Sequence, residues 1–156
     1  MLKIVEGDIF ESGADAILHQ VNCQGVMGSG VAKQVRDRYP WVFAEYRDRC
    51  FPFKIEMGTK KTSDLLGRIQ PVYINETQKI VNLFAQDHFG YDGKCYTDYD
   101  SLKECLRVVD ILFAGSTVAI PYLMGCHRGG GDWEVVSKMI EDTLKDCDVT
   151  LYKYTK

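Results

Sequence analysis

Glycines cluster in a stretch of this chain where the backbone could hold an anion. Gly25, Gly28 and Gly30 fall within six residues, between an apolar run at 16–21 and a run with helical spacing at 31–39. Glycine allows a positive φ and a close approach of the backbone to a ligand. The start of a helix adds unpaired N–H groups and the positive end of its dipole. The spacing matches neither the dinucleotide fingerprint nor the P-loop. The stretch therefore predicts either a phosphate cradle or a tight turn without a ligand.

A second glycine-rich loop occupies residues 125–131, after a short apolar run at 117–121. In open α/β sheets, ligands bind beyond the carboxyl ends of the strands. If the strands at 16–21 and 117–121 are parallel neighbours, the two loops face each other, and their amides can grip a pyrophosphate from both sides. A bulky β-branched residue at Gly130 is then expected to abolish ligand binding and to leave the fold intact.

The hydrophobic pattern predicts the elements that position these loops. We expect strands at 2–5, 16–21, 67–75, 79–84, 117–121 and 149–154, and helices at 31–39, 41–50, 98–113 and 133–144. Thr97 is expected to cap the third helix, with Asp100 three residues on, and Asp132 to cap the fourth. A polar surface excursion is expected at 51–64. Strands alternating with helices predict an α/β fold, with a mixed β-sheet flanked by helices in three α/β/α layers and one domain over residues 1–156.

The composition is that of an ordinary soluble domain. The chain has 156 residues, 46% of them hydrophobic and 26% charged, with a net charge of −3 that argues against broad nucleic-acid binding but not against a small anion. No apolar run approaches the roughly 20 residues of a membrane helix, and the first residues carry charges where a signal peptide would be apolar. The six cysteines lack Cys-x-x-Cys spacing, which favours reduced thiols in a cytoplasmic protein over a disulfide frame or a zinc site.

Five spaced motifs together resemble a macro domain. They are Gly-Asp-Ile at 7–9, His-Gln-Val-Asn-Cys-Gln-Gly at 19–25 with Gly-Ser-Gly-Val-Ala at 28–32, Asn-Leu-Phe-Ala-Gln at 82–86, Ile-Pro at 120–121, and the stretch 125–133. The resemblance covers essentially the whole chain. Macro domains bind ADP-ribose or remove groups from it. The branch that this chain most resembles holds ADP-ribose-1''-phosphate phosphatases and terminal ADP-ribose glycohydrolases.

The resemblance implies that the chain takes ADP-ribose or a derivative, including ADP-ribosylated protein or nucleic acid. No His, Cys and Asp cluster has metal-ligand spacing, and we expect a monomer with no cofactor, metal or membrane. The ligand-binding residues that it implies are Asp8, Ile9, Asn22, Gly28, Ser29, Gly30, Val31, Gly125, Cys126, His127, Arg128, Gly129, Gly130, Gly131 and Tyr154. Asp8 and the Ile9 backbone would read adenine, Asn22 the distal ribose, and the two loops the phosphates. Tyr154 would pack near the adenosine. The alternatives are that Asp8 caps local backbone, that Asn22 only forms a turn and that Tyr154 is an edge aromatic.

Two departures from the glycohydrolases of this branch bear on catalysis. The glycohydrolases resemble this sequence but have a Lys where Gln86 stands and an Asp where Gly129 stands. Neither the covalent adduct of a Lys nor the acid/base work of an Asp is open to Gln or Gly. The resemblance therefore favours a phosphatase-type hydrolase with His19 and His127 as catalytic candidates, acting as general acid or base. Open alternatives are a packed His19, a solvated His127, a reader without turnover, and a glycohydrolase with other catalytic residues.

Overall fold

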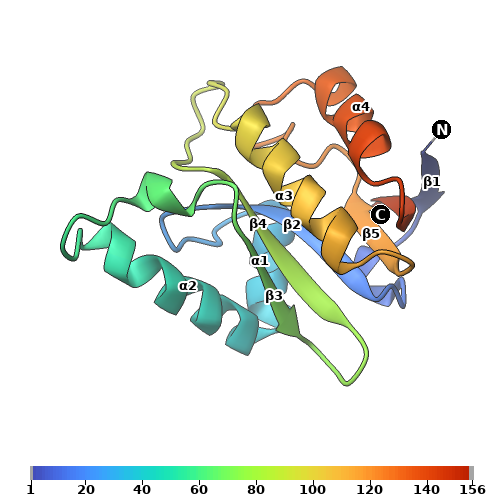
Figure 1. The fold of residues 1–156 in the computed structure, drawn as a ribbon, viewed down its shortest axis with the longest axis horizontal. Coiled ribbons are helices and arrows are strands. Elements are labelled where there is room, and N and C mark those ends of the chain that lie inside the picture. The colour runs from blue at the N-terminus through green and yellow to red at the C-terminus, as the bar shows by residue number, and fades with distance from the viewer. Residues whose placement is uncertain (1, 155–156) are drawn as a thin grey trace.

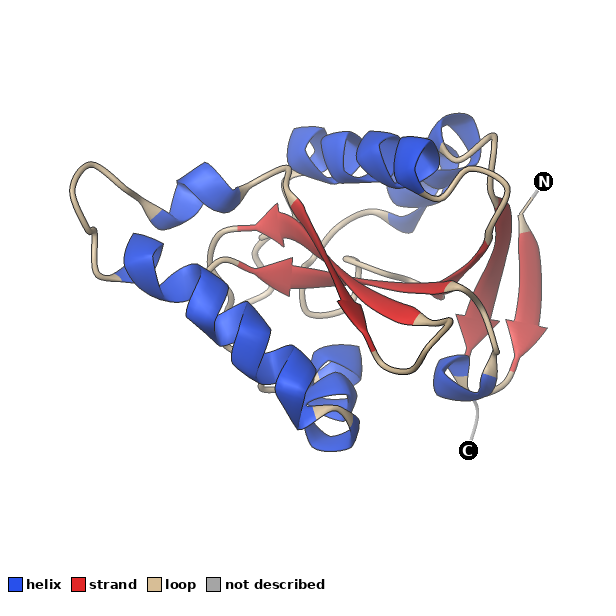
Figure 2. Cartoon of the chain, turned by 60° about the horizontal axis from the view of Figure 1, so that its bottom comes forward, coloured by secondary structure: helices blue, strands red, loops and turns tan. Residues whose placement is uncertain are grey.

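A six-stranded sheet lies between two pairs of helices in the computed structural model, which describes residues 2–154 (Figures 1 and 2). The strands are β1 (Lys3–Glu6), β2 (Ala16–Asn22), β3 (Ile69–Tyr73), β4 (Lys79–Gln86), β5 (Thr117–Pro121) and β6 (Asp148–Lys153). The helices are α1 (Gly30–Arg38), α2 (Pro40–Lys54), α3 (Tyr99–Leu112) and α4 (Trp133–Thr143), with short 3₁₀ helices η1 (Ile9–Glu11) and η2 (Thr62–Leu65). The α/β class and the three layers predicted from the sequence are confirmed.

The strand order is β1-β6-β5-β2-β4-β3, and every neighbouring pair is parallel except β3 and β4. The pair β2 and β5 carries the two glycine loops, because Ala16 pairs with Val118 and Ile17 with Ala119. The expectation that these strands are parallel neighbours is therefore confirmed. The hairpin expected from the polar turn at 75–78 is also present as the antiparallel pair β3 and β4.

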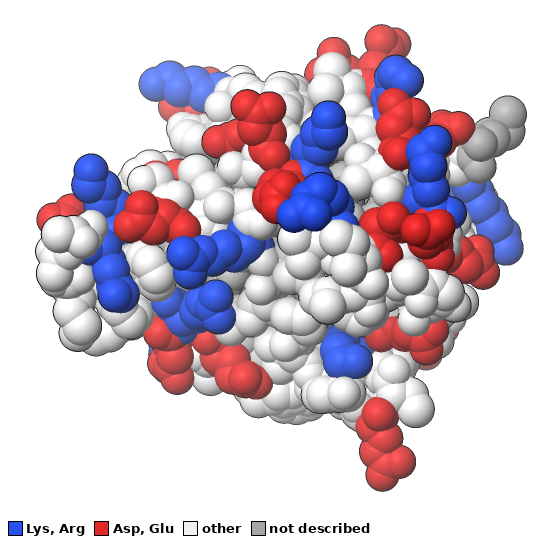
Figure 3. All heavy atoms as spheres, in the orientation of Figure 1, with Lys and Arg blue, Asp and Glu red and all other residues white. Residues whose placement is uncertain are grey.

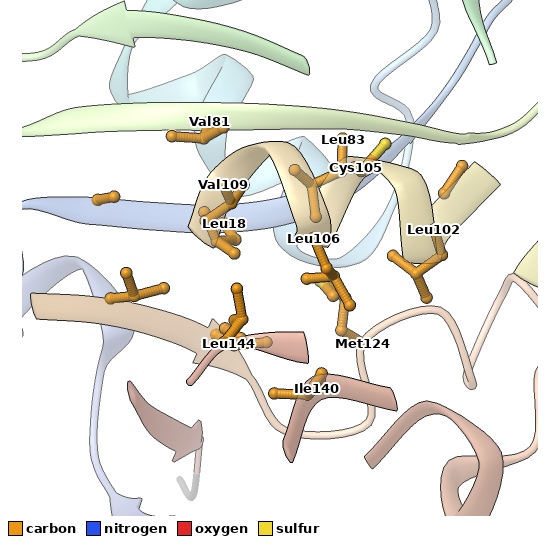
Figure 4. Packing of buried hydrophobic residues seen from close by; sticks show 14 of the residues in the cluster. Leu18, Val81, Leu83, Leu102, Cys105, Leu106, Val109, Met124, Ile140 and Leu144 are labelled. Carbon is orange, nitrogen blue, oxygen red and sulfur yellow. The ribbon is translucent and has the colours of Figure 1, made fainter. Parts of the chain in front are cut away.

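Alternation of side chains along β2 divides the core into two halves. Leu18 belongs to a buried cluster with residues of α3 and α4, such as Leu106 and Ile140 (Figure 4). Ile17 belongs to a second cluster with α1 and α2, which includes Tyr46. In Figure 2 the two helix pairs lie on opposite faces of the sheet. The central strand is thus buried on both faces, and its next residues, at 19–22, reach the carboxyl edge of the sheet.

Most element boundaries differ from the sequence prediction by one or two residues, and two differences have a clear structural reason. Helix α2 runs on to Lys54, so residues 51–54 are helical and are not part of a surface excursion. Phe53, one turn after the buried Cys50, packs against the second cluster and continues the buried face of the helix. The cap of α3 is Asp98, whose Oδ1 accepts a hydrogen bond from the Ser101 N–H at 3.2 Å. Asp132 caps α4 as expected, and accepts from the Glu134 N–H at 2.9 Å. Within residues 2–154, no helix combines the length and apolar composition that a membrane crossing requires.

Candidate functional site

One cleft of about 540 Å³ lies at the carboxyl ends of β2, β4 and β5. Its volume falls in the range of small-molecule sites, roughly 300–1,000 Å³. Both glycine-rich loops line it, the first through residues 28–30 and the second through residues 125 and 127–129. The convergence of two loops that are remote in sequence is therefore present in the fold.

Asn22, at the end of β2, shapes the first loop. Its Nδ2 donates to the Val26 carbonyl at 2.8 Å, and its Oδ1 accepts from the Gln24 N–H at 2.9 Å and from the Tyr46 hydroxyl at 2.8 Å. The carboxamide lines the cleft and folds the turn that precedes α1. The expected turn-forming role of Asn22 is thus visible in these bonds.

The first turn of α1 faces the cleft. Ser29 is the N-cap residue, and its side chain makes no capping hydrogen bond. Residues 28–32 all line the cleft, and the first N–H groups of a helix have no acceptor within the helix. With the positive end of the helix dipole, these groups make a favourable position for a phosphate.

Glycines let the second loop pack tightly onto the sheet edge. Gly125 has a φ of +76°, and a Cβ there would lie 2.7 Å from Oε1 of Gln20. A Cβ at Gly129 would lie 2.5 Å from the Thr97 hydroxyl oxygen. Gly131 closes the loop by donating its N–H to the Gly125 carbonyl at 2.9 Å. Because these glycines have no side chains, the loop can pack this closely onto the sheet edge.

Gly130 corrects one expectation. Its φ is +69°, and a Cβ there would collide with the carbonyl oxygen of Lys94. A β-branched residue would displace this backbone, so the prediction that such a variant leaves the fold intact is wrong. Gly130, together with Cys126 and Gly131, belongs to the second loop but does not line the cleft.

A hydrogen-bond network under the second loop contains residues that the sequence analysis did not single out as site residues. Nε2 of Gln20 donates to Oε1 of Gln86 and to the Thr97 hydroxyl, both at 2.8 Å. Thr97 in turn donates to the Gly125 carbonyl at 2.6 Å, and Gln86 donates to the His88 carbonyl at 3.0 Å. Gln20 was visible in the sequence as a polar residue in an apolar strand. In the sequence, Thr97 cannot be distinguished from an ordinary helix N-cap residue.

His19 lies deep in the cleft and His127 at its exposed rim. The His19 side chain is 2% exposed, and its Nε2 lies 2.5 Å from Oδ1 of Asn82. Burial lowers the pKa of His19 from 6.5 to about 4, although the hydrogen bond to Asn82 opposes this shift. At neutral pH the ring is uncharged, which suits a hydrogen-bond acceptor and does not suit a general acid. His127 also lines the cleft but is exposed.

Aromatic side chains border the cleft at both rims. The guanidinium of Arg128 lies 4.4 Å from the centre of the Tyr91 ring, which joins the second loop to the loop after β4 by a cation–π contact. Where β6 ends, the Lys153 ammonium lies 5.3 Å from the Tyr122 ring, and Tyr154 lines the cleft with 62% of its surface exposed. This end of the cleft offers flat apolar faces.

Asp8 and Ile9 lie beside the cleft but do not line it. The Gly7 N–H donates to the Lys153 carbonyl at 3.0 Å, which places Asp8 next to the end of β6. The Asp8 carboxylate accepts from the Phe10 N–H at 2.9 Å and pairs with Arg38 at 3.0 Å. Asp8 therefore does cap local backbone, as one of its two readings expected.

The cysteines and acidic residues form no second centre in the part of the chain that the structure describes. All six cysteines are free, and residues 2–154 contain no group of three or more His, Cys, Asp or Glu side chains that could hold a metal ion. Burial raises the pKa of the Cys126 thiol in the second loop to about 11. This thiol is therefore protonated at neutral pH.

Comparison with known proteins gives relatives with two different named activities. No family model matches the chain. It is 30% identical over 155 residues, which is 97% of the chain and 42% of the relative, to a DNA ADP-ribosyl glycohydrolase of Mycobacterium tuberculosis. It is 50% identical over 48 residues, which is 30% of the chain and 24% of the relative, to an ADP-ribose 1''-phosphate phosphatase of Aspergillus fumigatus. The chain thus spans less than half the length of these relatives.

The fold and the cleft define an α/β module that can hold a ligand at the carboxyl edge of its sheet. Among solved structures, the macrodomain of Mycobacterium tuberculosis DarG superposes with a TM-score of 0.74 at 26% identity, and the match covers 97% of each chain. The chain has the fold of a macro domain.

Proposed function

We propose that this macro domain binds ADP-ribose, or a molecule that carries ADP-ribose, in the cleft. The observation that carries the proposal is the convergence of the N-terminus of α1 with two glycine loops on one cleft. Backbone N–H groups from both sides stabilise a diphosphate through hydrogen bonds, without a charged side chain. The adenosine lies toward Tyr154, and the distal ribose lies toward Asn22 and His19. Asp8 accepts a hydrogen bond from the adenine amino group when Arg38 releases one carboxylate oxygen.

We further propose that the domain hydrolyses a bond at the distal ribose. In the phosphatase reaction, water attacks the phosphorus of a terminal phosphate and the bond from phosphorus to the ribose oxygen breaks, giving phosphate and ADP-ribose. His19 accepts a hydrogen bond from a hydroxyl or from the water, and Arg128 and His127 lie at the rim, where the terminal phosphate leaves. Gln86 supports this reading over a covalent adduct, because its carboxamide is not a nucleophile and is already bonded to Gln20.

A basic rim beside the first loop favours a second candidate, release of ADP-ribose from nucleic acid, the reaction named for the Mycobacterium relative. The Lys54 ammonium donates to the Gln24 carbonyl at 3.0 Å, and the Arg47 side chain packs against Gly25. Neither cation takes part in an ion pair found within residues 2–154. Lys and Arg side chains also gather near the carboxyl end of α2, at the left of Figure 3, interspersed with acidic ones. Such a rim suits a phosphate backbone.

Calorimetric titration with ADP-ribose tests the binding, with AMP and ribose 5-phosphate as partial ligands. We expect saturable heat with ADP-ribose and weaker binding of either fragment, and absence of heat with ADP-ribose would refute the proposed function. Size-exclusion chromatography of the same samples tests the monomeric state.

Turnover is tested with three substrates: ADP-ribose-1''-phosphate, ADP-ribosylated DNA and ADP-ribosylated protein. Release of phosphate identifies the phosphatase, and release of ADP-ribose identifies the glycohydrolase. Product that survives in both His19→Ala and His127→Ala would remove the catalytic assignment. Binding of ADP-ribose without any product would leave a reader.

A further inference from the structure

His19 lines the cleft and has a buried ring nitrogen without a hydrogen-bond partner within residues 2–154. Its Nδ1 has no hydrogen-bond partner among the described residues, although the side chain is only 2% exposed and lines the cleft. An unsatisfied buried polar atom destabilises the fold. A bound molecule that reaches this nitrogen from the cleft would supply the missing partner.

The chemical character of this nitrogen follows from the hydrogen bonds behind the ring. The backbone carbonyl of Glu45 on α2 can only accept, so Nε2 of Gln70 donates to it at 3.1 Å. This leaves Oε1 of Gln70 to accept from Nδ2 of Asn82 at 3.0 Å. Oδ1 of Asn82 must then accept from His19, whose Nε2 lies 2.5 Å away and carries the ring proton. Nδ1 of His19 is left with a lone pair.

The hydrogen bonds that run from Glu45 through Gln70 and Asn82 to His19, here called the relay, are built into the sheet. Gln70 pairs with Asn82 across β3 and β4, and Asn82 pairs with His19 across β4 and β2. Asn82 is 0% exposed, so water does not compete for its carboxamide. The Glu45 carbonyl on α2 thus determines the tautomer of the His19 ring on β2.

We propose that Gln70 and Asn82 are positioning residues that hold His19 as the Nε2–H tautomer, so that Nδ1 accepts a hydrogen bond from an O–H donor in the cleft. The donor is a ribose hydroxyl of the ligand or the attacking water, and this part of the proposal rests on the proposed function. The low pKa of His19 agrees with the proposal, because a protonated ring would carry a donor at Nδ1.

Nitrogen NMR of the free protein labelled with ¹⁵N-histidine tests the relay directly. The chain has three histidines, and a His19→Asn sample assigns the His19 signals. We expect at pH 7 a protonated Nε2 and an Nδ1 with the shift of an unprotonated ring nitrogen. An Nδ1–H tautomer in the wild-type protein would overturn the proposal. This measurement needs no ligand, so it is independent of the proposed function.

A matched pair of variants tests the role of Gln70. Gln70→Leu removes the acceptor of Asn82 and frees that carboxamide to turn, so a mixture of His19 tautomers is expected. Gln70→Glu keeps an oxygen toward Asn82 and should keep the wild-type tautomer. The control is Gln78→Leu, which removes a glutamine on the same hairpin that donates to the Ala14 carbonyl at 2.8 Å, away from His19. A single unchanged tautomer in Gln70→Leu would overturn the relay.

Binding and turnover of the same variants identify the O–H donor. If the donor is a ribose hydroxyl, Gln70→Leu weakens ADP-ribose binding about three- to tenfold and Gln70→Glu restores it. If the donor is the attacking water, the affinity stays and kcat falls instead. A changed tautomer with unchanged affinity and unchanged kcat would overturn the proposed use of Nδ1. If wild-type protein does not bind ADP-ribose, the proposed function fails, and NMR of the free protein still decides whether the relay exists.

Discussion

The burial of His19 predicts a specific dependence of stability on pH. The unfolded chain binds a proton at this histidine below pH 6.5, whereas the folded chain does so only near pH 4, because burial disfavours the charged ring. Between these values the unfolded state holds more protons, so its population is favoured as the pH falls. Above pH 6.5, His19 is therefore neutral in both states and does not reduce the free energy of unfolding. As the pH falls from 6.5 toward 4, it reduces that free energy progressively. For these two pKa values, acidification from pH 7.5 to 5 costs about 2 kcal/mol.

Urea unfolding of wild-type protein and of His19→Asn at the two pH values isolates this contribution. We expect the wild-type protein to lose about 2 kcal/mol more than the variant on going to pH 5, which corresponds to roughly 4–8 °C in Tm. Other titrating groups are common to both proteins and cancel in the difference. His88→Asn is the matched control, because the His88 side chain is 68% exposed, and it should follow the wild-type curve. Equal losses in wild-type protein and His19→Asn would refute the assignment of a neutral, buried ring.

Four further substitutions test the walls of the cleft. Gly125→Ala places a Cβ 2.7 Å from Oε1 of Gln20 at a residue with a φ of +76°, so we expect a loss of about 1–3 kcal/mol in urea unfolding, and an unchanged midpoint would contradict the tight packing of the loop. Arg128→Ala removes the cation–π contact with Tyr91, worth about 0.5–1 kcal/mol at an exposed site. Weaker ADP-ribose binding is expected by calorimetry in this variant and in Tyr91→Leu, and wild-type affinity in both would exclude a role for the contact. Gln86→Lys replaces the acceptor of Gln20 by an ammonium at a site that is 9% exposed, so we expect a loss of about 1–3 kcal/mol, and a variant of wild-type stability would show that the network adapts.

Much of the fold could be predicted because its elements carry strong local patterns. The period of Leu102, Leu106 and Val109 identifies α3, and these residues are buried as predicted. The boundaries were less certain where neighbouring residues have the same capping chemistry. Thr97 and Asp98 are both good caps, and only the approach of the Gly125 carbonyl draws the Thr97 hydroxyl away from the helix.

The candidate site likewise has features that the sequence indicated and features that it did not. Glycine spacing after apolar runs indicated both loops, because the requirement for a positive φ or a close backbone contact leaves a mark in the sequence. The roles of Gln20 and Gln86 left no such mark, because any polar residue at a strand end could face solvent. They become parts of a site only when β2 and β4 lie side by side and the second loop closes over them.

By itself, the sequence determined the alternation of strands and helices, the two loops able to approach an anion, and the polar residues set into apolar strands. These are properties of single residues and their spacing. The tertiary structure alone decided that the two loops share one cleft and that Arg38 occupies the Asp8 carboxylate. It also decided which nitrogen of His19 bonds to Asn82, because that bond ends a chain of hydrogen bonds that starts at the Glu45 carbonyl and crosses three strands.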